Sequence, residues 1–207
     1  MDKEMINFYY VQLNSCVKGE KVVFSFNGIE KMYLGLFTEA QYKKYKEDMT
    51  SVKRNLCTTK AVGTITSDGD WYAVFDNNGE TLDKINTSVR RFDPSFTNDE
   101  ARACSAPAGI SYVYNADDTA TKGVMIDHWK ENQHKDSKMD LSKKTFTCPS
   151  CGKTVNTSDL HGAHVEKIGG PKGKLYITPT CGSCNTSKTK RIFKVATIDL
   201  VDAPKEE

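Results

Sequence analysis

Four of the seven cysteines form two matched pairs with the spacing of metal ligands. Cys148 and Cys151 enclose Pro-Ser, Cys181 and Cys184 enclose Gly-Ser, and 29 residues separate the two pairs. Each pair places two thiolates on one tight turn, and two such turns that converge give the tetrahedral sulfur set that Zn²⁺ prefers. Two disulfides or four unrelated buried cysteines are the alternatives, but matched pairs of this spacing rarely arise without a metal. We therefore predict a structural Zn²⁺ site, in which four thiolates leave no position open for a substrate.

The remaining composition is that of an ordinary globular protein. The chain has 207 residues, of which 38% are hydrophobic and 27% charged, enough for one large or two small domains. The charged N-terminus leads into no apolar leader segment, and no stretch approaches the ~18 apolar residues of a membrane span. Cys16, Cys57 and Cys104 lie far apart, which suits a reducing compartment. We expect a cytoplasmic protein without a membrane partner.

Positive charge is concentrated in the segment that carries the cysteine pairs. Residues 143–194 contain ten Lys or Arg against two acids, a balance of +8, although the whole chain carries only +2. A compact basic module is typical of proteins that bind a phosphate backbone, and a lysine-rich solvated surface would have the same composition. We expect nucleic acid as the partner. The candidate phosphate-binding residues are Lys172, Lys174, Lys188, Lys190 and Arg191.

Residues 1–95 are expected to form a β-sandwich domain. The region contains six short runs of β-branched and aromatic residues, most of them separated by turn signals such as Asn-Gly. These runs are Phe8–Leu13, Lys21–Phe26, Lys31–Phe37, Val62–Ile65, Trp71–Phe75 and Ile85–Arg90. Only Thr38–Lys46 is expected to be helical, with Thr38 as its N-cap. Several short strands at this spacing indicate a sandwich or a small barrel.

The same region resembles a small β-sandwich domain of unknown function that occurs in bacterial proteins. The resemblance covers roughly residues 6–93. Its motifs are Val22–Phe26, Met32–Leu34 with the following helix, and Asp70–Asp76 followed by Ser88–Arg90. These are patterns of core residues, so the resemblance implies a fold and no catalytic site. Trp71 is expected in the core, with a ligand platform as the alternative, and we expect this domain to sense or target.

Residues 96–144 are expected to be a connector with short helical and strand elements. Pro94–Glu100 offers an N-cap and an acidic first turn for a short helix, and Ile110–Tyr114 fits a strand. Polar residues dominate the rest of the region, apart from an amphipathic piece around Trp129 that can dock on either domain.

Residues 145–207 carry a second pattern besides the cysteines. His161 and His164 precede a glycine-rich turn, a second apolar run ends in the second cysteine pair, and Asn185 follows at once. This order resembles the HNH family of ββα-metal nucleases, over roughly residues 148–190. The resemblance implies a histidine general base on the first strand, a returning second strand, and a helix that supplies a ligand to a catalytic cation. It also implies that zinc staples the scaffold.

Position by position, His164 matches the general base of that family and Asn185 matches the ligand of a catalytic Mg²⁺ or Mn²⁺. A neutral imidazole can take a proton from water near pH 7, while the cation neutralises charge that develops on the phosphate and on the leaving oxygen. Both roles are implied by the resemblance and depend on the two side chains meeting.

Two positions depart from the HNH pattern. Ala163 stands where the family usually has an Asp or His ligand, and Tyr176 stands where an asparagine commonly begins the second strand. His161 could replace the missing ligand only if Gly162 interrupts the strand, because residues three apart on a regular strand face opposite sides.

The sequence thus predicts a β-rich α+β protein, in which an N-terminal β-sandwich precedes a small zinc-stapled ββα domain of HNH or treble-clef type. The first expected function is a metal-dependent endonuclease that cuts nucleic acid, with DNA as the expected substrate. The second is a zinc-stapled nucleic-acid-binding module that does not cut, and the third is a protein-interaction adaptor. The basic balance argues against the adaptor, and Ala163 separates the first two functions.

Overall fold

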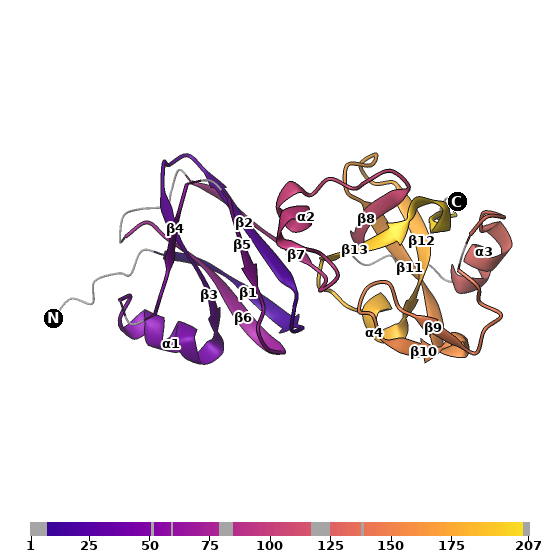
Figure 1. Cartoon of the computed structure of the whole chain (residues 1–207), viewed down its shortest axis with the longest axis horizontal. Helices are drawn as coiled ribbons and strands as arrows, with labels where there is room; N and C mark the ends of the chain where they lie inside the picture. The colour runs from indigo at the N-terminus through magenta and orange to yellow at the C-terminus, as the bar shows by residue number, and fades with distance from the viewer. Residues whose placement is uncertain are drawn as a thin grey trace. The chain divides into compact units, whose positions relative to one another are not determined.

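The computed structural model of the chain describes residues 8–50, 52–58, 60–78, 85–116, 125–137 and 139–204. The chain divides into two compact parts, Met1–Ala103 and Cys104–Glu207, called unit 1 and unit 2 below. Both are built mainly of short strands with few helices, as the colours from indigo to yellow allow the reader to follow in Figure 1. Among the described residues, no helix has both the length and the apolar character needed to cross a membrane.

Unit 1 consists of two antiparallel sheets and two short helices. Its strands are β1 (Phe8–Cys16), β2 (Lys21–Asn27), β3 (Met32–Thr38), β4 (Asn55–Cys57), β5 (Lys60–Thr64), β6 (Gly69–Asp76) and β7 (Asn86–Phe92), and its helices are α1 (Glu39–Glu47) and α2 (Asn98–Ala103). One sheet has the order β1-β6-β3-β4, and in the other β2 lies between β5 and β7. Each of the six expected runs falls on a strand, whereas β4 was not expected.

An apolar core lies between the two sheets of unit 1. Alternate residues of a strand point to the same face, so every second residue of β2 and β6 reaches this core. Its buried members come from both sheets and are Leu13, Cys16, Val22, Phe24, Phe26, Met32, Leu34, Ile65, Trp71, Ala73 and Phe75. Trp71 is therefore a core residue, as expected. The alternating runs thus form two sheets that share one apolar core.

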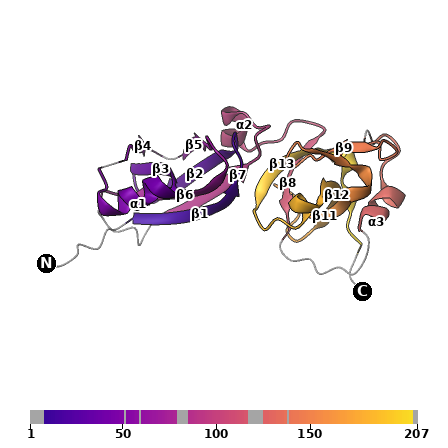
Figure 2. The same ribbon diagram turned by 90° about the horizontal axis from the view of Figure 1, so that it is seen from below.

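Helix α1 packs on the outer face of the four-stranded sheet, beside β3 in Figure 2. Its Tyr42 and Tyr45 are buried against Phe37 and Val74. The helix begins with a capping box, because Gln41 N–H donates to Thr38 Oγ1 (3.3 Å) and Thr38 N–H donates to Gln41 Oε1 (2.9 Å). The predicted N-cap of this helix is confirmed.

Unit 2 contains a five-stranded antiparallel sheet, a separate hairpin and two short helices. Its strands are β8 (Ile110–Asn115), β9 (Thr145–Thr147), β10 (Thr154–Asn156), β11 (Leu160–Lys167), β12 (Leu175–Cys181), β13 (Arg191–Ala196) and β14 (Val201–Asp202). Its helices are α3 (Met125–Asn132) and α4 (Gly182–Asn185), with 3₁₀ turns at Thr157–Asp159 and Thr197–Asp199. The strand order is β14-β12-β11-β8-β13, and β9 pairs with β10.

The region expected to be a connector contributes to this sheet. In β8, Val113 pairs with Lys167 of β11 on one side and with Phe193 of β13 on the other. Helix α3 packs on β11 and β12, where Trp129 is fully buried with Ile177. The helix and the strand of this region were expected from local pattern, but their partners, such as Gly162 for Met125 and Phe193 for Val113, lie far downstream and leave no local signal.

Candidate metal centre and its surroundings

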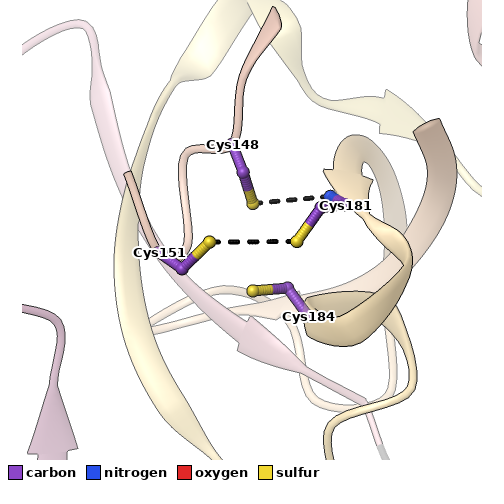
Figure 3. A group of neighbouring side chains, drawn as sticks. All are labelled: Cys148, Cys151, Cys181 and Cys184. Atoms are coloured by element: carbon purple, nitrogen blue, oxygen red, sulfur yellow. Dashed lines mark hydrogen bonds between the residues drawn. The ribbon is translucent and has the colours of Figure 1, made fainter. Parts of the chain in front are cut away.

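The four cysteines of the two CxxC pairs meet in unit 2. Their sulfur atoms all lie within 4.8 Å of one another, and Figure 3 shows the four side chains pointing toward a common centre. Cys148 and Cys151 come from the turn between β9 and β10, Cys181 ends β12, and Cys184 lies in α4. Three of them are buried and Cys151 is half-buried. The sequence prediction that the pairs converge is confirmed.

The spacing of the sulfurs fits a tetrahedral metal. Zn–S bonds of about 2.3 Å in a tetrahedron place neighbouring sulfurs about 3.8 Å apart. Cys151 Sγ and Cys181 Sγ are 3.8 Å apart. A disulfide would need about 2.0 Å between two sulfurs, and all four cysteines are free. The donor set of four thiols and its geometry therefore fit Zn²⁺.

Hydrogen bonds prepare the sulfurs to carry negative charge. The N–H of Cys181 points at Cys148 Sγ (3.4 Å), and Ser183 Oγ lies 3.2 Å from Cys181 Sγ. The contact with the Cys184 thiol, helped by backbone N–H groups, lowers the pKa of Cys148 to about 5. The same contact raises the pKa of Cys184, and burial adds to that rise. A bound Zn²⁺ would displace the protons that remain on the four thiols, because its ligands are thiolates.

The chain holds both cysteine turns by backbone contacts. In the first turn, Gly152 N–H donates to Cys148 O (2.8 Å) and Cys148 N–H donates to Lys153 O (2.9 Å). In the second, Asn115 Nδ2 of β8 donates to Cys184 O (2.5 Å) and to Ser187 O (3.2 Å). Asn115 thus ties α4 to the central sheet. Sequence reasoning missed this residue, whose only signal is its polar position at the end of an apolar strand.

Strand β11 is regular and places the two histidines on opposite faces. Its register with β12 is continuous from Leu160 to Glu166, so Gly162 does not interrupt the strand. His161 shares a face with Ala163, and His164 shares the other face with Gly162. The ring of His161 therefore lies on the face of Ala163 and points away from the ring of His164.

The two faces of β11 are covered by different helices. A Cβ added to Gly162 would lie 2.4 Å from the carbonyl carbon of Met125, so the start of α3 touches the face of His164. A Cβ added to Gly182 would lie 3.1 Å from His161 Nε2, so α4 lies next to His161. These contacts put α4 on the face that does not carry His164.

The residues matched to a nuclease site are therefore divided between two environments. His164 is only 9% exposed, and its face is packed against α3. Asn185 is half-buried at the end of α4, which has four residues, and His161 is exposed beside the start of this helix. The described side chains bring His161 close to α4 and leave His164 on the other side of the sheet.

The lysines of the basic segment lie mostly at the surface of unit 2. The exposed ones are Lys143, Lys144, Lys153, Lys172, Lys174, Lys188 and Lys190. Two candidate phosphate contacts differ from the rest. Lys174 Nζ is 3.1 Å from Asp202 Oδ1, and Arg191 is only 9% exposed. Lys172, Lys188 and Lys190 are the other candidates, and all three are exposed.

Comparisons with known proteins give no further assignment: no family, no curated protein and no solved structure matches this chain. What is established is a β-rich α+β protein with a four-cysteine cluster suited to a structural metal such as zinc.

Proposed function

We propose that this chain is a zinc-stabilised nucleic-acid-binding protein, in which unit 2 contacts the phosphate backbone. One observation carries the proposal: seven exposed lysines belong to the segment that also contains the four-cysteine cluster. Lys153 directly follows the first cysteine turn, and Lys188 and Lys190 follow the second. Zinc binding then fixes the loops that present these charges, and the lysines supply the sequence-independent attraction to phosphate.

A salt titration tests this proposal. Anisotropy of labelled DNA and RNA, single- and double-stranded, is measured with the full chain between about 50 and 200 mM salt. We expect binding that weakens steeply with salt. Replacing Lys172, Lys188 and Lys190 together by Gln should reduce the slope of log K against log salt by roughly 2 to 3, since each lost phosphate contact removes about 0.7 to 0.9.

The matched control changes three exposed lysines of unit 1, Lys31, Lys44 and Lys53, to Gln. This variant loses the same net charge, so it should keep the wild-type slope if the contact surface lies in unit 2. Equal effects of both triple variants would mean nonspecific attraction by net charge. Binding that is absent at low salt, or indifferent to salt, would contradict the proposal and favour the protein-interaction adaptor.

A second candidate function is a metal-dependent nuclease. It is favoured by the chain order β11, β12, α4, which repeats the ββα order, and by His161 Nε2 beside the start of α4. In this function Asn185 would hold Mg²⁺ or Mn²⁺, and a histidine would accept the proton of the attacking water. The position of α4 supports His161 for this role more than His164.

A plasmid-nicking assay with added Mg²⁺ or Mn²⁺ tests the nuclease. If the chain cuts, His161→Ala should reduce cleavage more than His164→Ala, with zinc content unchanged in both variants. Asn185→Ala should raise the concentration of divalent cation needed for activity. Ala163→Asp should not create activity, because it would bury a carboxylate in the apolar cluster of Val113, Val165 and Phe193. Absence of cleavage under all of these conditions would exclude the nuclease and leave nucleic-acid binding as the proposed function.

A further inference from the structure

Strand β1 of unit 1 exposes two successive tyrosines. Tyr9 is 47% exposed and Tyr10 is 46% exposed. Successive residues of a strand point to opposite faces of its sheet. Both faces of the sheet are therefore partly exposed to solvent at this point of β1. That pattern is expected where the neighbouring strand is missing. Strand β1 indeed forms an edge: it pairs with β6 on one side and with no described strand on the other.

Both tyrosines lie at the border of packed aromatic groups. On the inner face, the ring of Tyr9 is 5.9 Å from that of Phe75, a core residue. On the outer face, the ring of Tyr10 is 4.9 Å from that of Tyr42 and 6.1 Å from that of Tyr72. A further strand beside β1 would therefore extend an existing packed surface on each face.

Strand β1 lacks the features that usually protect an edge. Natural edge strands are short, charged or interrupted by proline, which prevents pairing with another chain. β1 is nine residues long and contains neither a charged residue nor a proline. The opposite edge of the same sheet is the three-residue β4. The one irregularity of β1 is a register shift after Leu13, which leaves Phe8–Leu13 as a regular stretch.

We propose that β1 pairs antiparallel with β1 of a second copy of this chain, forming a two-fold symmetric dimer through unit 1. An uncharged strand meets no like-charge repulsion when it faces itself, and a two-fold interface uses one surface patch twice. The second copy is thus a partner whose charge and hydrogen-bonding pattern match this edge. The dimer is independent of the proposed nucleic-acid binding, which concerns unit 2.

Face matching limits the register of this pairing. Inner-face residues must lie opposite inner-face residues, so near the middle of the regular stretch the two-fold axis passes through Tyr10 or Val11. In the first register Tyr9 lies opposite the partner's Val11, and in the second it lies opposite the partner's Leu13. Both registers place the half-exposed ring of Tyr9 against an aliphatic side chain, which removes apolar surface from water.

Sedimentation velocity of the full chain tests the proposal over about 1 μM to 1 mM protein, a range that includes weak specific association. The wild type should form dimers within this range. Tyr9→Lys should raise the dissociation constant about tenfold or more, because a two-fold interface contains the substitution twice. The control, Leu56→Lys, changes a residue that is 53% exposed on β4, the other edge of the sheet, and should dimerise like the wild type.

Gln12→Lys provides a second variant on β1, at an exposed position, so that the test does not depend on the folding of Tyr9→Lys. Circular dichroism and thermal unfolding check that each variant is folded. A wild type that stays monomeric over the whole range overturns the proposal. Folded Tyr9→Lys and Gln12→Lys variants that dimerise like the wild type, or equal loss of the dimer in Leu56→Lys, overturn the assignment to β1.

Discussion

Units 1 and 2 are both β-rich, but among the described residues different interactions stabilise the two units. The core of unit 1 joins eleven buried side chains of two sheets in one cluster. Two apolar clusters among the described residues of unit 2 are smaller, with five buried residues along the central sheet and three where α3 packs on it. Between the β9–β10 hairpin and α4, unit 2 instead buries cysteines together with Val155. Burial of apolar side chains thus stabilises unit 1, whereas the stability of part of unit 2 depends on its cysteine cluster.

The buried charges of the two units follow the same division. Unit 1 pairs Glu20 with Arg91, whose Nη2 is 3.2 Å from Glu20 Oε2, and pairs Asp76 with Arg54. Both carboxylates are fully buried, so each guanidinium offsets a charge that would otherwise be costly. In unit 2 the concentrated negative charge would be that of four thiolates, and only a metal cation can offset it. The two units should therefore respond differently to metal removal.

The largest expected effect separates the units by metal dependence. Cys181→Ser should unfold residues 145–195 and leave unit 1 folded, because structural zinc contributes about 10–16 kcal/mol in zinc-finger peptides, as much as the whole stability of a typical domain. Hydrogen exchange detected by mass spectrometry should show protection retained in β1–β7 and lost in β9–β12. Simultaneous loss of protection in both units would break the comparison, since unit 1 would then depend on the metal too.

The reciprocal change removes a buried aromatic side chain from the core of unit 1. Phe75 is fully buried between the sheets, so Phe75→Ala should destabilise unit 1 by about 3–5 kcal/mol through lost burial and a residual cavity. Chemical denaturation followed by Trp71 fluorescence measures this loss. The variant should still bind one zinc per chain. A Phe75→Ala protein without zinc would show that the metal centre needs an intact unit 1.

A smaller effect is expected where the central sheet of unit 2 meets the metal centre. Asn115→Ala removes two hydrogen bonds to carbonyls of the second cysteine turn and should cost about 1–3 kcal/mol. Competition with a zinc chelator should therefore reveal faster metal loss, while thermal unfolding of unit 1 stays unchanged. Wild-type metal retention would mean that the cysteine turns need no support from β8.

The smallest effect concerns the start of α1 in unit 1. Thr38→Ala removes the side-chain half of the capping box and should cost about 1 kcal/mol. The loss should be seen in denaturant unfolding of unit 1 and should leave zinc binding untouched. Gly in place of Thr38 should cost less than Ala, because it restores access of water to the helix N-terminus. If Thr38→Gly cost more than Thr38→Ala, the loss would come from packing of the side chain and not from capping.

The sequence predicts local features of this protein well. The convergence of Cys148 and Cys181 follows from the matched spacing of their pairs, and the strands of unit 1 follow from alternation and turn residues. Thr38 is recognisable as an N-cap from residue type and the acidic first turn alone. In each case the signal lies within a few residues of the feature it predicts.

Features that depend on distant residues could not be predicted in the same way. The conditional argument that His161 and His164 face opposite sides is confirmed by the register of β11, but only the packing of α3 shows which face is covered. The tie from Asn115 to α4 joins residues about 70 positions apart. Such contacts depend on tertiary packing, which leaves no periodic pattern in the chain.

The most direct test of the central claim is zinc K-edge X-ray absorption of the purified full chain. The four-cysteine centre predicts one zinc per chain with four sulfur ligands at about 2.3 Å and no nitrogen or oxygen in the first coordination shell. His161 and His164 would then lie outside that shell. A chain without stoichiometric zinc, or a first shell in which a histidine nitrogen replaces a sulfur, would contradict the account.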